Sequence, residues 1–162
     1  METTLNELDD FIAISVPLTG YSKVELQTTG LCAVYLQALN DILGATLWKE
    51  WLSVTATVLK GPGGKAQDKA IRQQLLASLK YGPITRNVIQ LWYWGSWLPL
   101  PKDWVAAYGK GIKRNDNYFI SPAAYKEGLI WKAMGSHPQG AKQSGFGSWE
   151  VAPLSATAQV KH

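Results

Sequence analysis

Apolar residues recur along this chain at the three- and four-residue spacing that is typical of amphipathic helices. A hydroxyl at Thr4 and a carboxylate at Glu7 fit a capping box, so we expect the first helix to start there. Further helices are predicted from the spacing over residues 25–43, 46–59, 66–80, 84–94 and 122–134. No series of alternating strands interrupts them. The pattern therefore predicts an all-α fold.

Glycine and proline mark the ends of these helices. Gly20, Gly44 and Gly95 each follow the last apolar position of a predicted helix. Residues 61–64, GPGG, are predicted to form a turn or short loop, and residues 81–83, YGP, are predicted to stop the helix before them. The breaks are too short to be linkers between domains.

The last third of the chain is predicted to contain long irregular segments. Residues 97–118 hold two prolines and two glycines, and this segment is expected to lack regular structure. Ser121 and Pro122 then provide an N-cap and a first helical position for one helix that reaches about Met134.

The organisation is that of a single helical domain over residues 1–162. Its ordered core is expected over roughly residues 5–154, and the small, polar residues 155–162 are expected to form a frayed tail.

Tryptophan and tyrosine are frequent in this chain, which has eight of the first and seven of the second. Four aromatic residues fall within residues 92–97, and one helix face cannot bury them all because consecutive side chains point about 100° apart. We expect Trp131 and Trp149 to cover this segment, another protein chain to bind it, or both. The residues predicted to contact a partner are Trp92, Tyr93, Trp94, Trp97, Trp104, Trp131, His137, Phe146 and Trp149.

Charge is divided unevenly along the sequence. Residues 1–50 carry seven acids and two bases, a net −5, whereas residues 60–114 carry ten bases and two acids, a net +8. The bases of the second segment are scattered, which favours a solvated face. Composition leaves two other functions open: a basic helical module that binds nucleic acid, and a tryptophan-rich domain that binds carbohydrate.

The sequence contains no recognisable catalytic set. Cys32 is the single cysteine and lies in an apolar helical context, so we expect a buried structural thiol. His137 lacks partners at metal-ligand spacing, and we expect it to bond a backbone carbonyl within a loop. The glycines at 109–111 and 140–147 lack the lysine or third glycine of nucleotide-binding loops. We expect no enzyme activity, no metal and no cofactor in this chain.

Three groups of residues resemble one protein family and occur in that family's order. The first is residues 11–20, FIAISVPLTG, and the second is residues 90–97, QLWYWGSW. The third comprises residues 121–131, SPAAYKEGLIW, with 137–138, HP, and 145–149, GFGSW. Over nearly its whole length the chain thereby resembles the small subunit of bacterial FAD-dependent sugar and sugar-alcohol dehydrogenases, of the sorbitol, fructose and gluconate dehydrogenase type.

The resemblance implies a non-catalytic accessory subunit. In that family a large flavoprotein holds FAD and oxidises the sugar, and a multihaem cytochrome c subunit passes the electrons to quinone at the membrane. The small subunit binds the large one, helps it to mature and carries a twin-arginine export signal for both. We therefore expect the FAD-binding large subunit as the direct partner and the cytochrome as an indirect one, with no nucleic acid and no membrane span.

The resemblance also implies a location in the periplasm or at the periplasmic face of the inner membrane. Residues 1–10, METTLNELDD, contain no twin arginine and no apolar run, so we expect no export signal in the printed chain, which leaves the cytoplasm open. Residues 137–149, HPQGAKQSGFGSW, are expected to form a loop anchored by Phe146 and Trp149. This loop is expected to close the core or to face the large subunit, and to bind no ligand.

Overall fold

A computed structural model describes residues 2–138 of the chain, with side chains from Asn6 onward. Its elements follow in the order α1 (Glu2–Thr19), α2 (Lys23–Thr28), α3 (Cys32–Leu43), α4 (Ala45–Leu59), α5 (Lys65–Ala70), the π-helix η1 (Ile71–Leu76), α6 (Gly82–Trp94), β1 (Ser96–Trp97), α7 (Lys102–Tyr108), β2 (Tyr118–Phe119), α8 (Pro122–Lys126) and α9 (Leu129–Ala133). The predicted all-α fold class is confirmed for this part of the chain. No helix within it is both long and apolar enough to cross a membrane. The predictions for residues 139–162, including Phe146, Trp149 and the tail, lie outside the described residues.

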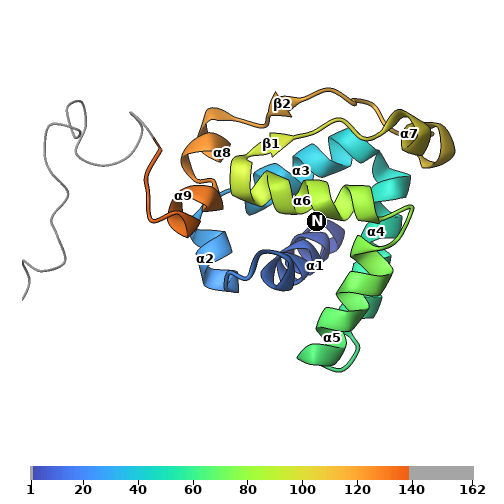
Figure 1. Ribbon diagram of the computed structural model, residues 1–162, viewed down its shortest axis with the longest axis horizontal. Helices are drawn as coiled ribbons and strands as arrows, with labels where there is room; N and C mark the ends of the chain where they lie inside the picture. Colours follow the sequence, from blue (N-terminus) through green and yellow to red (C-terminus); the bar gives the residue numbers. More distant parts are fainter. Residues whose placement is uncertain (1, 139–162) are drawn as a thin grey trace, which may run out of the picture.

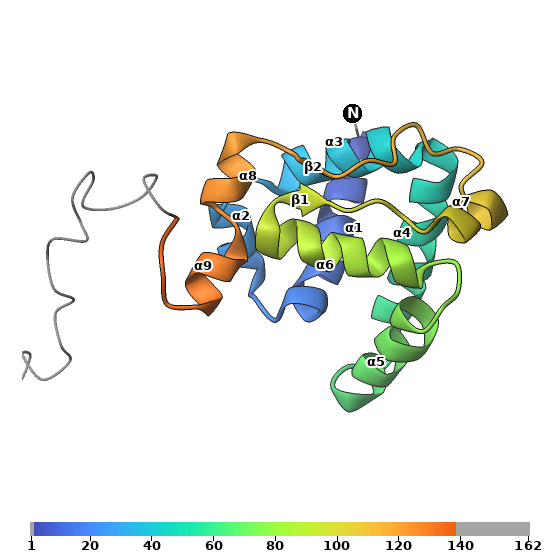
Figure 2. The same cartoon turned by 45° about the horizontal axis from the view of Figure 1, so that its top comes forward.

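Helices α1, α3, α4 and α6 form the body of the molecule (Figure 1). α1 packs against the other three, so its apolar residues are enclosed by all of them. α2, α8 and α9 lie together at one end, and α4 forms a hairpin with α5 and η1 that extends from the body (Figure 2). The molecule therefore has two distinct extremities, which differ in the side chains they expose.

An aromatic cluster at the centre joins the four helices of the body. Phe11 of α1 stacks on Trp92 of α6 with ring centroids 5.9 Å apart, and it meets Trp48 of α4 edge-on at 5.8 Å. Tyr35 of α3 meets Trp92 edge-on at 5.0 Å. The Trp92 indole N–H donates to Ser15 Oγ at 2.9 Å, and the Ser15 hydroxyl donates to the Phe11 carbonyl at 2.7 Å. All five side chains are buried, so this cluster fixes α6 on α1.

The single helix predicted over residues 25–43 is wrong, because the chain turns between α2 and α3. Gly30 adopts a φ of 71°, which ends the first helix. The Thr29 hydroxyl donates to the Leu26 carbonyl at 2.7 Å and accepts from the Leu31 N–H at 3.1 Å. These local bonds satisfy the backbone carbonyl of Leu26 and the N–H of Leu31 at the turn. Because the apolar spacing continues across the turn, the spacing alone did not reveal it.

The first helix begins earlier than predicted. α1 starts at Glu2, so Thr4 lies inside the helix and does not cap it. A capping box is present instead at the start of α2, where Ser22 Oγ accepts from the Glu25 N–H and the Glu25 carboxylate accepts from the Ser22 N–H.

The helix predicted over residues 66–80 ends early and changes type. α5 continues directly into η1, whose wider turn closes at residue 76. Leu79 lies four residues after the buried Leu75, a spacing that would place it on the buried face of a continuous helix, but its side chain is 81% exposed because the helix has ended before it. Residues 81–83, expected to act as a stop, instead begin α6, with Pro83 in its first turn.

The helix predicted from Ser121 starts as expected and then breaks. Ser121 Oγ accepts from the Ala124 N–H at 3.0 Å, and Pro122 occupies the first helical position. The helix stops before Gly128, where a Cβ would lie 2.7 Å from the Tyr93 carbonyl. The chain resumes as α9, so close packing against α6 divides the predicted helix in two.

The segment 97–118, predicted to be irregular, contains α7 and contributes to a short antiparallel ribbon. β1 pairs with β2, with Ser96 opposite Phe119 and Trp97 opposite Tyr118. The sequence pattern did not predict this ribbon, which returns the chain to the C-terminal end of α6.

Ser15→Ala tests the central cluster. It leaves the buried Trp92 N–H without its acceptor, so we expect the free energy of unfolding to fall by about 1–3 kcal/mol. Thr57→Ala is the matched control, because the Thr57 hydroxyl makes the same bond to the carbonyl four residues earlier on an exposed face. The control should change the free energy of unfolding by less than about 0.5 kcal/mol. Urea unfolding measures both, and equal losses would contradict the role of Ser15.

Gly95→Ala tests the contact between α6 and α8, with Gly30→Ala as its control. The two glycines have φ values of 69° and 71°. A Cβ on Gly95 would lie 2.5 Å from the Ala124 backbone, whereas Gly30 has nothing within 4 Å. Gly30→Ala should cost about 1 kcal/mol for its backbone conformation. Gly95→Ala should cost about 1–3 kcal/mol more, because α8 must move. Similar melting temperatures for the two variants would show that α8 does not press on Gly95.

Candidate functional site

The aromatic residues predicted to contact a partner divide between the core and the surface. Trp92, Trp97 and Trp104 are buried, with exposed fractions of 1%, 0% and 5%. The Trp104 indole N–H donates to the Lys80 carbonyl at 2.9 Å, which ties α7 to the turn before α6. These three tryptophans belong to the core of this chain, and the surface available to a partner is formed by other residues.

Two neighbouring residues at the end of α6 have different environments. The Trp94 side chain is 51% exposed. Tyr93 is partly buried, and its hydroxyl donates to the Thr19 carbonyl at 2.8 Å. Burial raises the pKa of the Tyr93 hydroxyl, so it remains a neutral donor that joins α6 to the end of α1.

Three aromatic side chains form a continuous surface strip over β2, α8 and α9, which we call the aromatic strip. The Tyr125 ring meets Phe119 edge-on at 6.2 Å and Trp131 edge-on at 5.3 Å. The Trp131 indole N–H donates to the Tyr125 carbonyl at 2.7 Å. Phe119 is 59% exposed and Tyr125 is 37% exposed. The sequence analysis identified Trp131 as a contact residue but not Phe119 or Tyr125. Phe119 lies on the ribbon that the sequence pattern did not predict, and Tyr125 joins the strip through its contact with Phe119.

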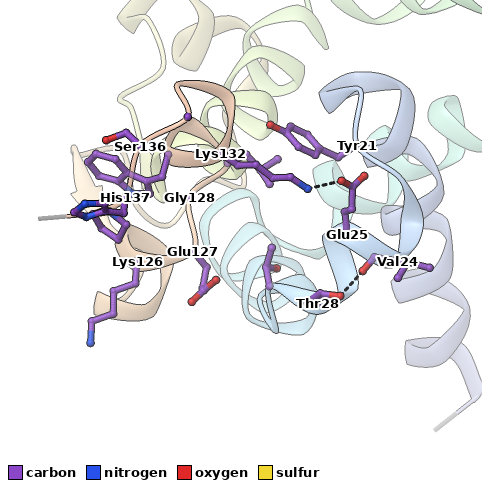
Figure 3. Close-up of a pocket in the computed structure, with 15 residues that line it drawn as sticks. Tyr21, Val24, Glu25, Thr28, Lys126, Glu127, Gly128, Lys132, Ser136 and His137 are labelled. Carbon is purple, nitrogen blue, oxygen red and sulfur yellow. Dashed lines mark hydrogen bonds and ion pairs between the residues drawn. The ribbon is translucent and has the colours of Figure 1, made fainter. Parts of the chain in front are cut away.

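A groove of about 530 Å³ adjoins the strip, between α2 and the segment from α8 to Pro138 (Figure 3). Its apolar and aromatic lining comprises Tyr21, Val24, Leu129, Trp131 and Pro138, and its ionisable lining comprises Glu25, Lys126, Glu127, Lys132 and His137. Trp131 belongs to both the groove and the strip. The two features therefore form one surface at this end of the molecule.

An ion pair crosses this groove and links its two walls (Figure 3). Lys132 of α9 donates to the Glu25 carboxylate of α2, and its ammonium lies 5.2 Å from the centre of the Tyr21 ring. Glu25 also accepts from the Ser22 N–H at 2.9 Å and from the Ser22 hydroxyl at 2.8 Å. The bond from Lys132, followed by those from Ser22, lowers the pKa of Glu25 to about 2. Glu25 is therefore ionised at any physiological pH.

Titratable residues elsewhere provide no metal centre in the described part of the chain. Residues 2–138 contain no group of three or more His, Cys, Asp or Glu side chains that could hold a metal ion. His137 is exposed, and the loop in which it is predicted to bond a backbone carbonyl continues outside the described residues. Cys32 is buried, as predicted, with Sγ 3.4 Å from the Leu26 carbonyl, and burial raises the pKa of its thiol.

Lys132→Gln tests the ion pair across the groove. The folded pKa of Glu25 lies below its ordinary value of 4.5, so the pair stabilises the fold above that pH and is lost as pH falls toward 2. In Lys132→Gln the carboxylate loses its largest stabilising contact, and we expect its titration midpoint to move up toward 4.5. Carboxyl ¹³C NMR measures this midpoint. Lys126→Gln, on the same wall of the groove, is the control, and an equal shift in both variants would contradict the specific pairing.

Comparison with protein-family models, with curated proteins and with solved structures finds no match to this chain. The functional argument therefore rests on the chain's own residues: the sequence motifs, the aromatic strip and the groove beside it.

Proposed function

We propose that this chain is the non-catalytic small subunit of a FAD-dependent sugar or sugar-alcohol dehydrogenase. In this role it binds and stabilises the flavin-containing catalytic subunit and helps it to mature and to be exported. FAD belongs to the partner, and a multihaem cytochrome c takes electrons from that partner. The complex works in the periplasm or at the periplasmic face of the inner membrane. The motif resemblance supports the family, and the surface at the α8–α9 end supports the binding role.

The exposed aromatic strip is the observation that carries the binding role. Phe119 is 59% exposed. Trp94 is 51% exposed and directly precedes Gly95, whose carbonyl accepts from the N–H of Ile120, the residue after Phe119. Aromatic side chains dominate the residues whose loss weakens protein interfaces most. Each square ångström of apolar surface removed from water contributes roughly 25 cal/mol. A contiguous aromatic strip is therefore better suited to burial against a partner than to permanent contact with solvent.

The described parts of the three groups that carry the resemblance, residues 11–20, 90–97 and 121–131, contact one another at this end. The Tyr93 hydroxyl, from the second group, donates to the Thr19 carbonyl of the first at 2.8 Å. Gly128, from the third group, allows the backbone to approach the Tyr93 carbonyl closely. These contacts support a shared role for the three groups, which is to position the aromatic strip and the groove on one rigid support.

Binding by itself explains how such a subunit stabilises its partner. A chain that binds the folded flavoprotein and not its unfolded form shifts the folding equilibrium by mass action. At a concentration about 100 times the dissociation constant, the gain is about 2.7 kcal/mol. No catalytic group is needed for this function.

Co-expression with the flavoprotein encoded beside this chain tests the proposal. We expect a tagged chain to retain a second subunit with stoichiometric flavin absorbance. Phe119→Ser removes an exposed anchor of the strip and should weaken the complex at least about tenfold. Leu79→Ser is the matched control, because Leu79 is 81% exposed but lies beyond η1, away from the strip.

Binding measured by surface plasmon resonance or by flavin retention distinguishes the outcomes. A colourless chain that elutes alone, although the flavoprotein is soluble, would overturn the accessory role. Equal weakening by Phe119→Ser and Leu79→Ser would overturn the assignment of the strip as the contact.

A further inference from the structure

The hairpin formed by α4, α5 and η1 carries a concentration of positive charge at its tip. The cationic residues there are Lys60, Lys65, Lys69 and Arg72, and all four side chains are exposed. Asp68 is the acid among them, so residues 60–72 have a net charge of +3. Within the described range of the chain, none of the four cations forms a hydrogen bond, an ion pair or a ring contact.

Helix geometry aligns most of these charges. Lys65, Lys69 and Arg72 are separated by four and three residues, so they share one face of the helix over a length of about 10 Å. The opposite face packs against α4, where Ile71 and Leu75 have exposed fractions of 5% and 0%. The hairpin thus buries its apolar residues internally and presents a charged stripe outward.

The position of the tip leaves this stripe accessible. The hairpin extends away from the body in both views of the molecule, with the loop that joins α4 to α5 at its far end (Figures 1 and 2). The aromatic strip and the groove lie at the α8–α9 end. A partner bound there leaves the tip of the hairpin free.

We propose that the tip of this hairpin docks electrostatically on an anionic phospholipid surface. This inference does not depend on the flavoprotein partner. Clusters of four to eight Lys and Arg residues attract anionic lipid headgroups, and the contact requires charge without a shaped pocket. The hairpin projects from the body, so a flat bilayer surface can approach its tip (Figures 1 and 2).

Two observations favour lipid over other anionic partners. Residues 60–78, all of them described, include no exposed large hydrophobic side chain, whereas the core of a protein interface or the stacking of bases requires such groups. Four cations are also fewer than the six to ten phosphate contacts of a typical duplex-binding protein. Lipid headgroups diffuse laterally and gather around a small cluster of cations, so binding to lipid does not require a long row of phosphate contacts.

Vesicle flotation of the full 162-residue chain tests this inference. Each Lys or Arg near an anionic surface contributes about fivefold to partitioning, so a net +3 predicts on the order of a hundredfold preference. We expect this preference for phosphatidylcholine vesicles with 30% phosphatidylserine over pure phosphatidylcholine vesicles at low ionic strength. Half-molar sodium chloride should remove it, because the charges are exposed.

Charge variants locate the contact on the hairpin. Lys65→Gln with Lys69→Gln should reduce binding to anionic vesicles about thirtyfold, and Asp68→Asn should increase it about fivefold. Lys102→Gln with Lys110→Gln makes the same change in net charge at exposed positions around α7, and should alter binding less than about twofold. Circular dichroism confirms that each variant is folded.

Three results would overturn the inference. The first is equal flotation with both kinds of vesicle. The second is an equal effect of the hairpin variant and the α7 variant, which would reflect net charge alone. The third is tighter, hairpin-dependent binding to a duplex DNA oligonucleotide, which would identify nucleic acid as the occupant of this surface.

Discussion

The burial of Trp92 between Phe11 and Tyr35, with its N–H bonded to Ser15, is the interaction on which the rest of the structure depends. One tryptophan touches side chains from α1 and α3 and accounts for the position of α6. The bond from the Trp92 N–H to Ser15 is directional, so it also fixes the rotation of α6 about its axis. The direction in which the neighbouring aromatic residues point follows from that rotation.

Once α6 is placed, the surface at its C-terminal end is determined by close backbone contacts. Trp92 points inward and Trp94 outward, because residues two apart lie on different sides of a helix. Gly95 and Gly128 lie where α8 and the end of α6 approach each other, and neither position has room for a side chain. These contacts hold α8 and α9 against the body, and so they align Phe119, Tyr125 and Trp131 into one strip.

The two extremities of the molecule expose different chemistry. The α8–α9 end presents aromatic side chains and a groove whose charges, Glu25 and Lys132, are already paired with each other. The hairpin presents cations that are paired with nothing in the described part of the chain. An unpaired charge costs more to cover than a paired one, whereas unpaired exposed cations attract an anionic neighbour. This division agrees with a protein partner at one end and a charged surface at the other.

The sequence by itself determined the fold class, the limits of several helices and the burial of the Cys32 thiol. Helical spacing is a local property, and the glycines that end α1, α3 and α6 act through their own backbone, so Gly20, Gly44 and Gly95 were sufficient signals. The tertiary structure decided where helices break without losing their apolar spacing, as at Gly30 and Gly128. It also decided which tryptophans are buried and which residues form the strip. Those features depend on contacts between residues distant in sequence, such as Trp92 with Ser15 and Gly128 with Tyr93, and local periodicity carries no information about them.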